Sequence, residues 1–353
     1  MLFPITICTF NDGFRFIVNY TGANTGMDKK FEIIVTLGPS VEEIINDLLE
    51  AGATSFRLNC SHISLEQLTR WMVKVDEAFN RRGDTVTLWL DLQGAKLRIG
   101  KLQQMLFIHS DELVTFANQY SQVDKKIPLP HPRLFKSISI GDEISLDDGR
   151  INGLVVDFDD ESFVVKITTG GELSSHKGFH KAGYDREIEA LFARDITFIE
   201  QTRAFNYIGY ALSYIQTARE VQLFKEHTSD HPLTAKIERL KSFDNLREIA
   251  DIADSLWLCR GDLGVDINLY DLFHYEKEFI KHLELTRKPL LIAGQVFENM
   301  VTHSYPSRSE IAHFGYLVEN GFSGVVLSDE TAVGGYPVKV VEFCRDYFEF
   351  MKN

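Results

Sequence analysis

The feature that most constrains the fold is a repeated alternation of short apolar runs with segments of helical periodicity. From residue 31, FEIIVTL is followed by VEEIINDLLEAG, then by TSFRLNCS, LEQLTRWMVKVDEAFN and VTLWLDL. The short runs are rich in β-branched residues, and the longer segments repeat apolar residues every three or four positions. Strand followed by helix is the βα unit, which predicts a parallel sheet covered by helices.

The alternation is interrupted once and then resumes. Between residues 99 and 180, segments such as DEISLDDGRINGLVVDF and SFVVKITTGGEL are joined by Asp-Gly and Gly-Gly turns, which indicates an all-β insert. Three predicted strands precede this insert and five follow it, and eight is the number of strands in a TIM barrel. The five later strands are predicted at 207–213, 232–237, 255–259, 288–294 and 324–328.

We therefore predict an α/β fold: a TIM (β/α)8 barrel with a small all-β lid domain inserted after the third strand. The barrel comprises residues 29–98 and 181–353, which together approach the roughly 250 residues typical of this fold. The insert, residues 99–180, is interpreted as a β-barrel lid. Residues 1–28 are interpreted as an N-terminal extension, because they lack the basic segment and small-residue cleavage site of a signal peptide.

Charge and cysteine content narrow the possible partners. The net charge of −14 argues against a protein that binds nucleic acid or an anionic membrane, and no apolar run is long enough to span a membrane. The four cysteines have no metal-like spacing, so we expect reduced thiols in a cytoplasmic enzyme. They are Cys8, Cys60, Cys259 and Cys344.

Charged residues fall at the predicted carboxyl ends of the strands, where TIM barrels place their active sites. One such residue alone is usually a solvated loop residue or part of an ion pair, but several at one barrel mouth indicate a site. Glu238 and Asp262 are hard carboxylates suited to Mg²⁺ or Mn²⁺. The backbone at Gly261 can approach an anion closely. With cations suited to phosphate, this set predicts phosphoryl transfer; the cations are Arg57, Arg98 and Lys236.

Several segments, in order along the chain, resemble the successive motifs of the pyruvate kinase family. The resemblance spans roughly residues 29–340, and the KIE…RGDLGV block and LSDETAVGGYP are its most specific parts. It implies a TIM barrel with a β-barrel lid and conversion of phosphoenolpyruvate and ADP to pyruvate and ATP with a divalent metal. The other matching segments are FEIIVTLGPS, TSFRLNCSH, LWLDLQGAKLRIG, GDEISLDDGRI, GGELSSHKG and SRSE.

The resemblance also implies roles for individual residues. Glu238 and Asp262 resemble the ligands of Mg²⁺ or Mn²⁺, and Lys236 resembles the lysine that contacts the transferring phosphoryl group and stabilises the enolate. Arg57 resembles the arginine that grips phosphate. The other matches are Asn59, Ser61 and Asp91 in the monovalent-cation region, the backbone of Gly261 and Asp262 with Gly294 at the substrate carboxylate, and Asp148 and Lys177 in the lid.

Two positions bear on activity. DLQGAK resembles the family versions with Lys rather than Glu at position 96, so the ammonium group of Lys96 is expected to replace K⁺ beside Asp91. Gly294 stands where the family usually has Thr, whose hydroxyl is associated with substrate binding and with the proton delivered to the enolate. We therefore expect slow turnover, which a well-folded Gly294→Thr variant would raise.

Other departures concern residues near the site and the end of the chain. His313 and Tyr316 stand where the family tends to have Asp and Asn, and Gln216 stands where an Arg often follows the fourth strand. His313 is interpreted mainly as a packing or interface residue. The chain ends soon after YPVKVVEFCRDYFEFMKN, so control through the family's C-terminal regulatory domain is not expected.

These departures leave alternatives open. The same barrel mouth could serve a metal-dependent pyruvate or phosphoenolpyruvate enzyme of the aldolase or lyase type, or a non-catalytic phosphoenolpyruvate-binding protein. The cations and lid residues favour phosphoryl transfer, because an aldolase needs no contacts to a nucleotide. The expected partners are phosphoenolpyruvate or pyruvate, ADP or ATP, and a second copy of the chain through the barrel.

Overall fold

A computed structural model of the chain describes residues 31–352, except for 62, 81–85, 95, 119–125, 148, 182, 185–192, 268 and 287. Near the N-terminus it also gives the backbone of two antiparallel strands, β1 (Ile7–Thr9) and β2 (Arg15–Ile17). The rest of the extension expected over residues 1–28 lies outside the described residues. No helix within the described ranges is both long enough and apolar enough to cross a membrane.

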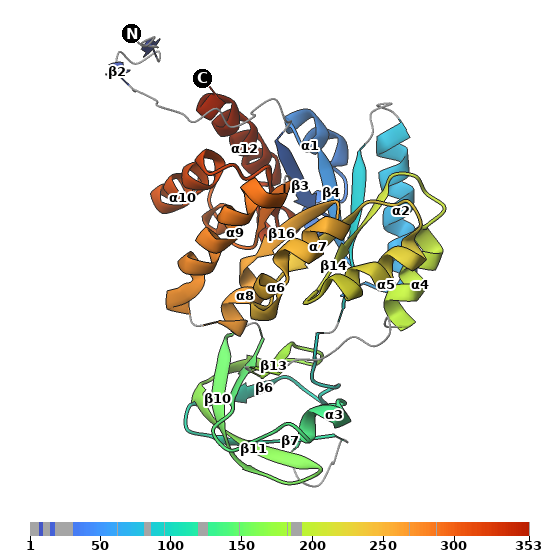
Figure 1. Cartoon of the computed structure of the whole chain (residues 1–353), viewed down its shortest axis with the longest axis vertical. Coiled ribbons are helices and arrows are strands. Elements are labelled where there is room, and N and C mark those ends of the chain that lie inside the picture. Colours follow the sequence, from blue (N-terminus) through green and yellow to red (C-terminus); the bar gives the residue numbers. More distant parts are fainter. Residues whose placement is uncertain are drawn as a thin grey trace.

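Eight parallel strands close into a barrel surrounded by helices (Figure 1). Pairing of β18 with β3, and of β5 with β14, completes the ring. Each apolar run singled out in the sequence forms one of these strands, so the predicted TIM barrel is confirmed. The strands are β3 (Glu32–Thr36), β4 (Ser55–Asn59), β5 (Thr87–Asp91), β14 (Ile208–Leu212), β15 (Leu233–Ile237), β16 (Ser255–Cys259), β17 (Leu290–Ala293) and β18 (Gly324–Leu327).

Two apolar layers hold the barrel together. The larger layer lies between strands and helices, and a smaller cluster contains Trp89 and Trp257 in edge-to-face contact, with ring centres 5.7 Å apart. Edge-to-face packing is a favoured arrangement of two aromatic rings. The helices are α1 (Ile45–Ala51), α2 (Leu65–Asn80), α4 (Ala193–Thr202), α5 (Ala218–Thr228), α6 (Leu240–Asp244), α7 (Leu246–Ile252), α8 (Arg260–Asp266), α9 (Leu272–Thr286), α10 (Arg308–Glu319), α11 (Asp329–Ala332) and α12 (Pro337–Lys352), with short 3₁₀ turns η1 (Pro39–Val41), η2 (Leu269–Asp271) and η3 (Glu298–Val301).

A small β unit, here called the β insert, interrupts the barrel between β5 and α4 and lies beyond one end of it (Figure 1). Its strands form a six-stranded sheet, in the order β13-β9-β10-β11-β7-β8, and a separate pair, β12-β6. Its own apolar cluster includes stacked Phe116 and Phe163. The elements are β6 (Leu106–Ile108), β7 (Leu113–Ala117), β8 (Ile127–Pro128), α3 (Pro132–Phe135), β9 (Glu143–Leu146), β10 (Ile151–Phe158), β11 (Ser162–Thr169), β12 (Gly171–Leu173) and β13 (Phe179–Lys181).

Polar contacts join the end of the β insert to the barrel. His180 Nε2, on β13, lies 3.4 Å from Asp266 Oδ1 at the end of α8. Arg239, just after β15, donates from Nη2 to the carbonyl oxygen of Tyr184 at 2.9 Å and lies 3.2 Å from the same Asp266 oxygen. Asp266 therefore links both parts of the chain beside the barrel mouth.

Candidate active site

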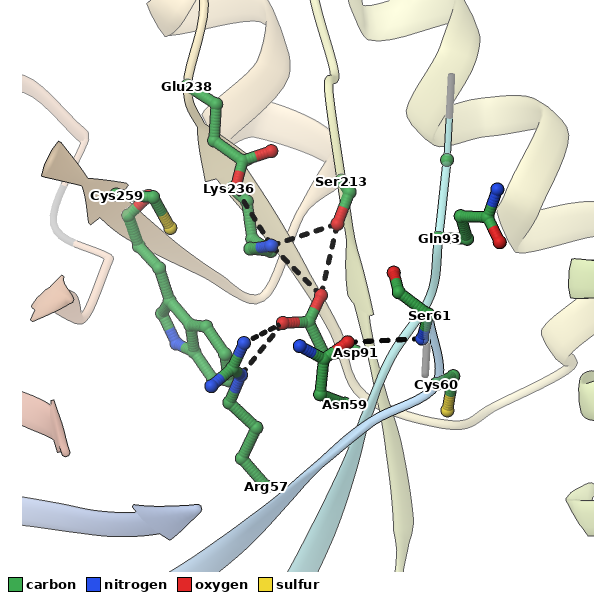
Figure 2. A network of polar contacts seen from close by, with 12 residues as sticks. Arg57, Asn59, Cys60, Ser61, Asp91, Gln93, Ser213, Lys236, Glu238 and Cys259 are labelled. Atoms are coloured by element: carbon green, nitrogen blue, oxygen red, sulfur yellow. Dashed lines mark hydrogen bonds and ion pairs between the residues drawn. The ribbon is translucent and has the colours of Figure 1, made fainter. Parts of the chain in front are cut away.

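Four charged side chains form a continuous network at the carboxyl ends of strands β4, β5 and β15, with β14 between the last two (Figure 2). Arg57 of β4 donates to Asp91 Oδ2 of β5 from Nε at 2.7 Å, and its Nη2 lies 2.6 Å from the same oxygen. Lys236 Nζ of β15 lies 2.9 Å from Asp91 Oδ1 and 2.8 Å from Glu238 Oε1. Ser213 also donates to Asp91 Oδ1, at 3.0 Å. The strand-end residues predicted from the sequence thus meet in one site.

Burial and pairing together set the charges of this network. Burial alone would raise the pKa of Asp91, but the adjacent Lys236 and Arg57 outweigh it, and the pKa is lowered. Burial alone would lower the pKa of Lys236, but Asp91 and Glu238 raise it well above its usual range. Both partners are therefore charged at neutral pH, since ion pairing favours the charged forms. Lys236 is a buried, permanent cation at the barrel mouth.

Glu238 provides a carboxylate oxygen suited to a metal ion. The side chain is fully buried, and burial raises its pKa despite the nearby Lys236. Its Oε2 accepts a hydrogen bond from the backbone N–H of Tyr214 at 2.8 Å. Its Oε1 contacts Lys236 as an ion pair but accepts no hydrogen bond from any described group. The partner of this buried oxygen is thus the Lys236 ammonium, so Oε1 already faces positive charge, as a ligand of a metal cation would.

Asp262 lies close to Glu238, in the first turn of α8. Its Oδ1 accepts a hydrogen bond from the Tyr214 hydroxyl at 2.6 Å and pairs with Lys96 Nζ at 2.8 Å. Burial would raise the pKa of Asp262, but Lys96 and Lys236 lower it well below its usual range. Tyr214 donates to both Glu238 and Asp262, so the two carboxylates lie near each other. This pair fits a divalent cation.

The ligands of such a cation would not all come from the protein. Within the described ranges, no group of three or more His, Cys, Asp or Glu side chains could hold a metal by itself. Two carboxylates leave most positions around Mg²⁺ to water and substrate, as Mg²⁺ prefers. The donor set therefore suits a metal that binds together with a phosphate ligand.

The predicted monovalent-cation region lies around Asp91. Asn59 Oδ1 accepts from the backbone N–H of Ser61 at 3.1 Å, beside Asp91 (Figure 2). The cations that contact Asp91 are Arg57 and Lys236. The ammonium of Lys96 pairs with Asp262, and the backbone N–H groups of residues 93 and 94 donate to Asp195 of α4. The expected role of Lys96 beside Asp91, and its replacement of K⁺, stay predictions.

A cleft of about 980 Å³ separates the barrel mouth from the β insert. Its barrel wall includes Arg260, Gly261, Gly294 and Gln295, and its other wall includes β-insert residues near Arg150. A cleft of this volume is within the range of small-molecule sites. Gly261 and Gly294, two of the candidate residues for a substrate carboxylate, thus line a space large enough for a nucleotide and a small acid.

Gly294 has a conformation that other residues rarely adopt. Its φ is +86°, and an added Cβ would lie 3.3 Å from the backbone nitrogen of Gly261. Arg260 fixes this turn by donating to the carbonyl oxygen of Gly294 from Nε at 3.0 Å and from Nη2 at 2.7 Å, and to that of Gln295 at 2.9 Å. The backbone conformation of this turn therefore favours glycine, and a threonine side chain does not fit without strain.

His313 contacts Arg260, the side chain that binds this turn. Its Nδ1 lies 3.2 Å from Arg260 Nη1, and its Nε2 lies 2.8 Å from Oε1 of the buried Glu276. The side chain thus connects a buried carboxylate to the arginine that supports Gly294. This agrees with the interpretation of His313 as a packing residue and explains which turn it supports.

The family model described as "Pyruvate kinase, barrel domain" matches residues 28–341. The chain belongs to the pyruvate kinase family. A pyruvate kinase from Agrobacterium vitis is 32% identical over 328 residues, which cover 91% of this chain and 69% of the relative. One from Thermococcus litoralis is 32% identical over 321 residues, covering 89% and 68%. A solved pyruvate kinase structure from Cryptosporidium parvum has a TM-score of 0.83 at 26% identity, covering 92% of this chain and 69% of its own.

In this pyruvate kinase family member, the predicted lid residues contact their own neighbours. Lys177 Nζ pairs with Asp147 Oδ1 at 2.7 Å, and Asp148 lies outside the described residues. Arg98 donates from Nη1 to the carbonyl oxygen of His176 at 2.9 Å. Arg98 therefore faces the β insert and does not join the Arg57–Asp91–Lys236 network, which corrects the expectation that all three cations converge.

Two site residues of the pyruvate kinase barrel were missed by the sequence analysis. Ser213 donates to Asp91 at 3.0 Å and is itself 2.9 Å from Lys236 Nζ, and Tyr214 contacts both Glu238 and Asp262. Both follow β14 directly. The strand-end rule that found the other residues also applies to this fourth strand, and it would have found these two.

Proposed function

We propose that this chain transfers the phosphoryl group of phosphoenolpyruvate to ADP, giving pyruvate and ATP, with Mg²⁺ or Mn²⁺ held by Glu238 and Asp262. The observation that carries the proposal is a buried lysine, Lys236, kept charged at the barrel mouth by ion pairs with Asp91 and Glu238. Membership of the pyruvate kinase family supports the same reaction.

The cations of the site would do most of the catalytic work, since phosphoryl transfer depends on positioning and charge neutralisation. The Lys236 ammonium would contact the transferring phosphoryl group and stabilise the enolate left behind. Arg57 is held by Asp91 in a two-nitrogen contact and would bind a phosphate oxygen. When bound, the divalent cation would neutralise phosphate charge and polarise the oxygens it contacts.

The reaction breaks the bond between phosphorus and the enol oxygen and forms a bond from phosphorus to a terminal oxygen of ADP. The enolate then takes a proton at carbon to give pyruvate. Backbone N–H groups at Gly261 and Asp262 would hold the substrate carboxylate at the cleft wall. Gly294 supplies no hydroxyl, so water in the cleft would bring the proton, and this step is expected to be slow.

Two further features belong to the proposal. The Lys96 ammonium would remove the need for K⁺ by supplying a fixed positive charge at the site, from its position on Asp262. The β insert would act as a lid whose residues Lys177, Arg98 and Asp148 approach the nucleotide. A homodimer formed through the barrel remains a prediction that sedimentation velocity can test.

A product assay tests the reaction. Phosphoenolpyruvate, Mg²⁺ and a panel of nucleoside diphosphates are supplied, and pyruvate and nucleoside triphosphate are measured separately. Glu238→Gln and Asp262→Asn are expected to abolish both products. Glu200→Gln, on the exposed face of α4, removes the same charge outside the site and should leave both products unchanged. A parent protein that forms no ATP, or that consumes pyruvate together with an aldehyde or keto acid, would overturn the proposal.

A further inference from the structure

Tyr214 has a backbone conformation that is costly for a tyrosine. It follows the end of β14 with φ +61°, in the left-handed region. A bulky residue is rarely found there, and such strain persists only where surrounding contacts impose it. The side chain is also nearly buried, with 9% of its surface exposed.

The contacts of Tyr214 explain this conformation. Its backbone N–H donates to Glu238 Oε2 at 2.8 Å, and its hydroxyl donates to Asp262 Oδ1 at 2.6 Å. One residue therefore binds both carboxylates of the site, Glu238 directly after β15 and Asp262 in α8 after β16, which lie 24 positions apart in the chain. Backbone and side chain can reach the two carboxylates at once in this conformation.

Each of the two hydrogen bonds occupies one oxygen of a carboxylate and leaves the other oxygen of that carboxylate to a different partner. On Glu238, the oxygen bound by Tyr214 is Oε2, while Oε1 faces the Lys236 ammonium at 2.8 Å. On Asp262, Tyr214 and Lys96 both bind Oδ1, which leaves Oδ2 as the oxygen for another ligand. A hydrogen bond to one carboxylate oxygen orients the other and tunes its strength as a metal ligand.

We propose that Tyr214 is a positioning residue for the divalent metal. Its backbone amide orients Glu238 and its hydroxyl orients Asp262, so that Glu238 Oε1 and Asp262 Oδ2 face the same ion. The inference rests on the proposed function, because it takes these two carboxylates as the metal ligands. Lys96 pairs with Asp262, whereas the hydrogen bond to Glu238 Oε2 comes from Tyr214.

Mn²⁺ binding to the Tyr214→Phe variant tests the inference. Titration calorimetry is carried out with phosphoenolpyruvate present and ADP absent, so that no turnover occurs. Loss of a hydrogen-bonding partner of a metal ligand typically weakens affinity 10–100-fold, and we expect a loss in this range. The electron paramagnetic resonance spectrum of bound Mn²⁺ should also change, which a role in folding alone would not produce.

Tyr210→Phe is the matched control. Tyr210 lies on the same strand and is also buried, but its hydroxyl contacts Thr202 at 3.0 Å and neither carboxylate. It should bind Mn²⁺ as the parent does. If Tyr214→Phe unfolds, Tyr214→Asn replaces it, because Asn tolerates positive φ and retains the amide bond to Glu238; it should show the same loss.

The outcomes separate this inference from the proposed function. If Asp262→Asn loses Mn²⁺ binding but folded Tyr214→Phe or Tyr214→Asn binds like the parent, the role of Tyr214 is overturned and the metal site stands. If Asp262→Asn binds Mn²⁺ like the parent, or the parent binds none, the proposed metal site fails and the inference fails with it.

Discussion

Replacing Gly294 with Ala should destabilise the protein by an amount that its backbone conformation sets. The residue has φ +86°, and the left-handed region costs a residue with a Cβ roughly 1–2 kcal/mol. The added Cβ would also lie 3.3 Å from the Gly261 nitrogen and 3.7 Å from the Arg260 nitrogen, the first being tighter than most real contacts. Together we expect the free energy of unfolding to fall by about 1–3 kcal/mol.

Urea denaturation followed by tryptophan fluorescence measures this change, with Gly261→Ala as the matched control. Gly261 lies in α8, and an added Cβ there meets no heavy atom within 4 Å. Ala in place of a helical Gly typically stabilises by about 0.5–1 kcal/mol, so the two variants should differ in sign. A Gly294→Ala protein that is as stable as the parent, or more stable, would refute the reasoning.

The same geometry changes what we expect of Gly294→Thr. From the sequence, threonine was expected to raise pyruvate formation. In the structure, its β-branched side chain would carry the strain of Ala and also stand over the Gly261 amide that is proposed to hold the substrate carboxylate. We now expect lower stability and a higher KM for phosphoenolpyruvate. A stable Thr variant with faster turnover would restore the expectation from the sequence.

Three further predictions concern charge. Burial lowers the pKa of His180 from 6.5 to about 4, although Asp266 opposes it, so the free energy of unfolding should be highest above pH 6.5 and lose up to about 3 kcal/mol as the pH falls towards 4. Urea titrations across this range should show a shallower dependence for His180→Gln, and an unchanged slope would contradict the assignment. Asp91→Asn should cost about 3–5 kcal/mol in the same assay, because Arg57 and Lys236 lose a buried partner, and a loss below about 1 kcal/mol would argue against it. The parent's activity should be alike in Na⁺ and K⁺ while Lys96→Met gains a K⁺ requirement; a parent strongly activated by K⁺ would disprove the replacement.

The strands and the neighbourhood of the site could be predicted because they depend on local pattern. A buried parallel strand must be short, apolar and rich in β-branched residues, and all eight such runs form barrel strands. In a closed parallel barrel the carboxyl ends of all strands meet at one mouth. Residues such as Arg57, Asp91 and Lys236 therefore had to lie near one another once the strands were assigned.

The pairing of charges inside the site depended on tertiary structure. The sequence placed Lys96, Arg98 and Lys236 near the barrel mouth but did not say which groups they contact. In the structure Lys96 pairs with Asp262, Arg98 donates to the β insert, and Lys236 pairs with Asp91 and Glu238.

Backbone conformation was the other property that the sequence alone did not reveal. The left-handed φ of Tyr214 accompanies hydrogen bonds to two carboxylates that follow other strands, and that of Gly294 accompanies three hydrogen bonds from Arg260 to the turn. Such conformations cost energy locally and exist only where long-range contacts offset the cost. The sequence by itself determined the barrel and the residues at its mouth, whereas only the folded chain decided which oxygen each donor binds, since that depends on contacts between residues far apart in the sequence.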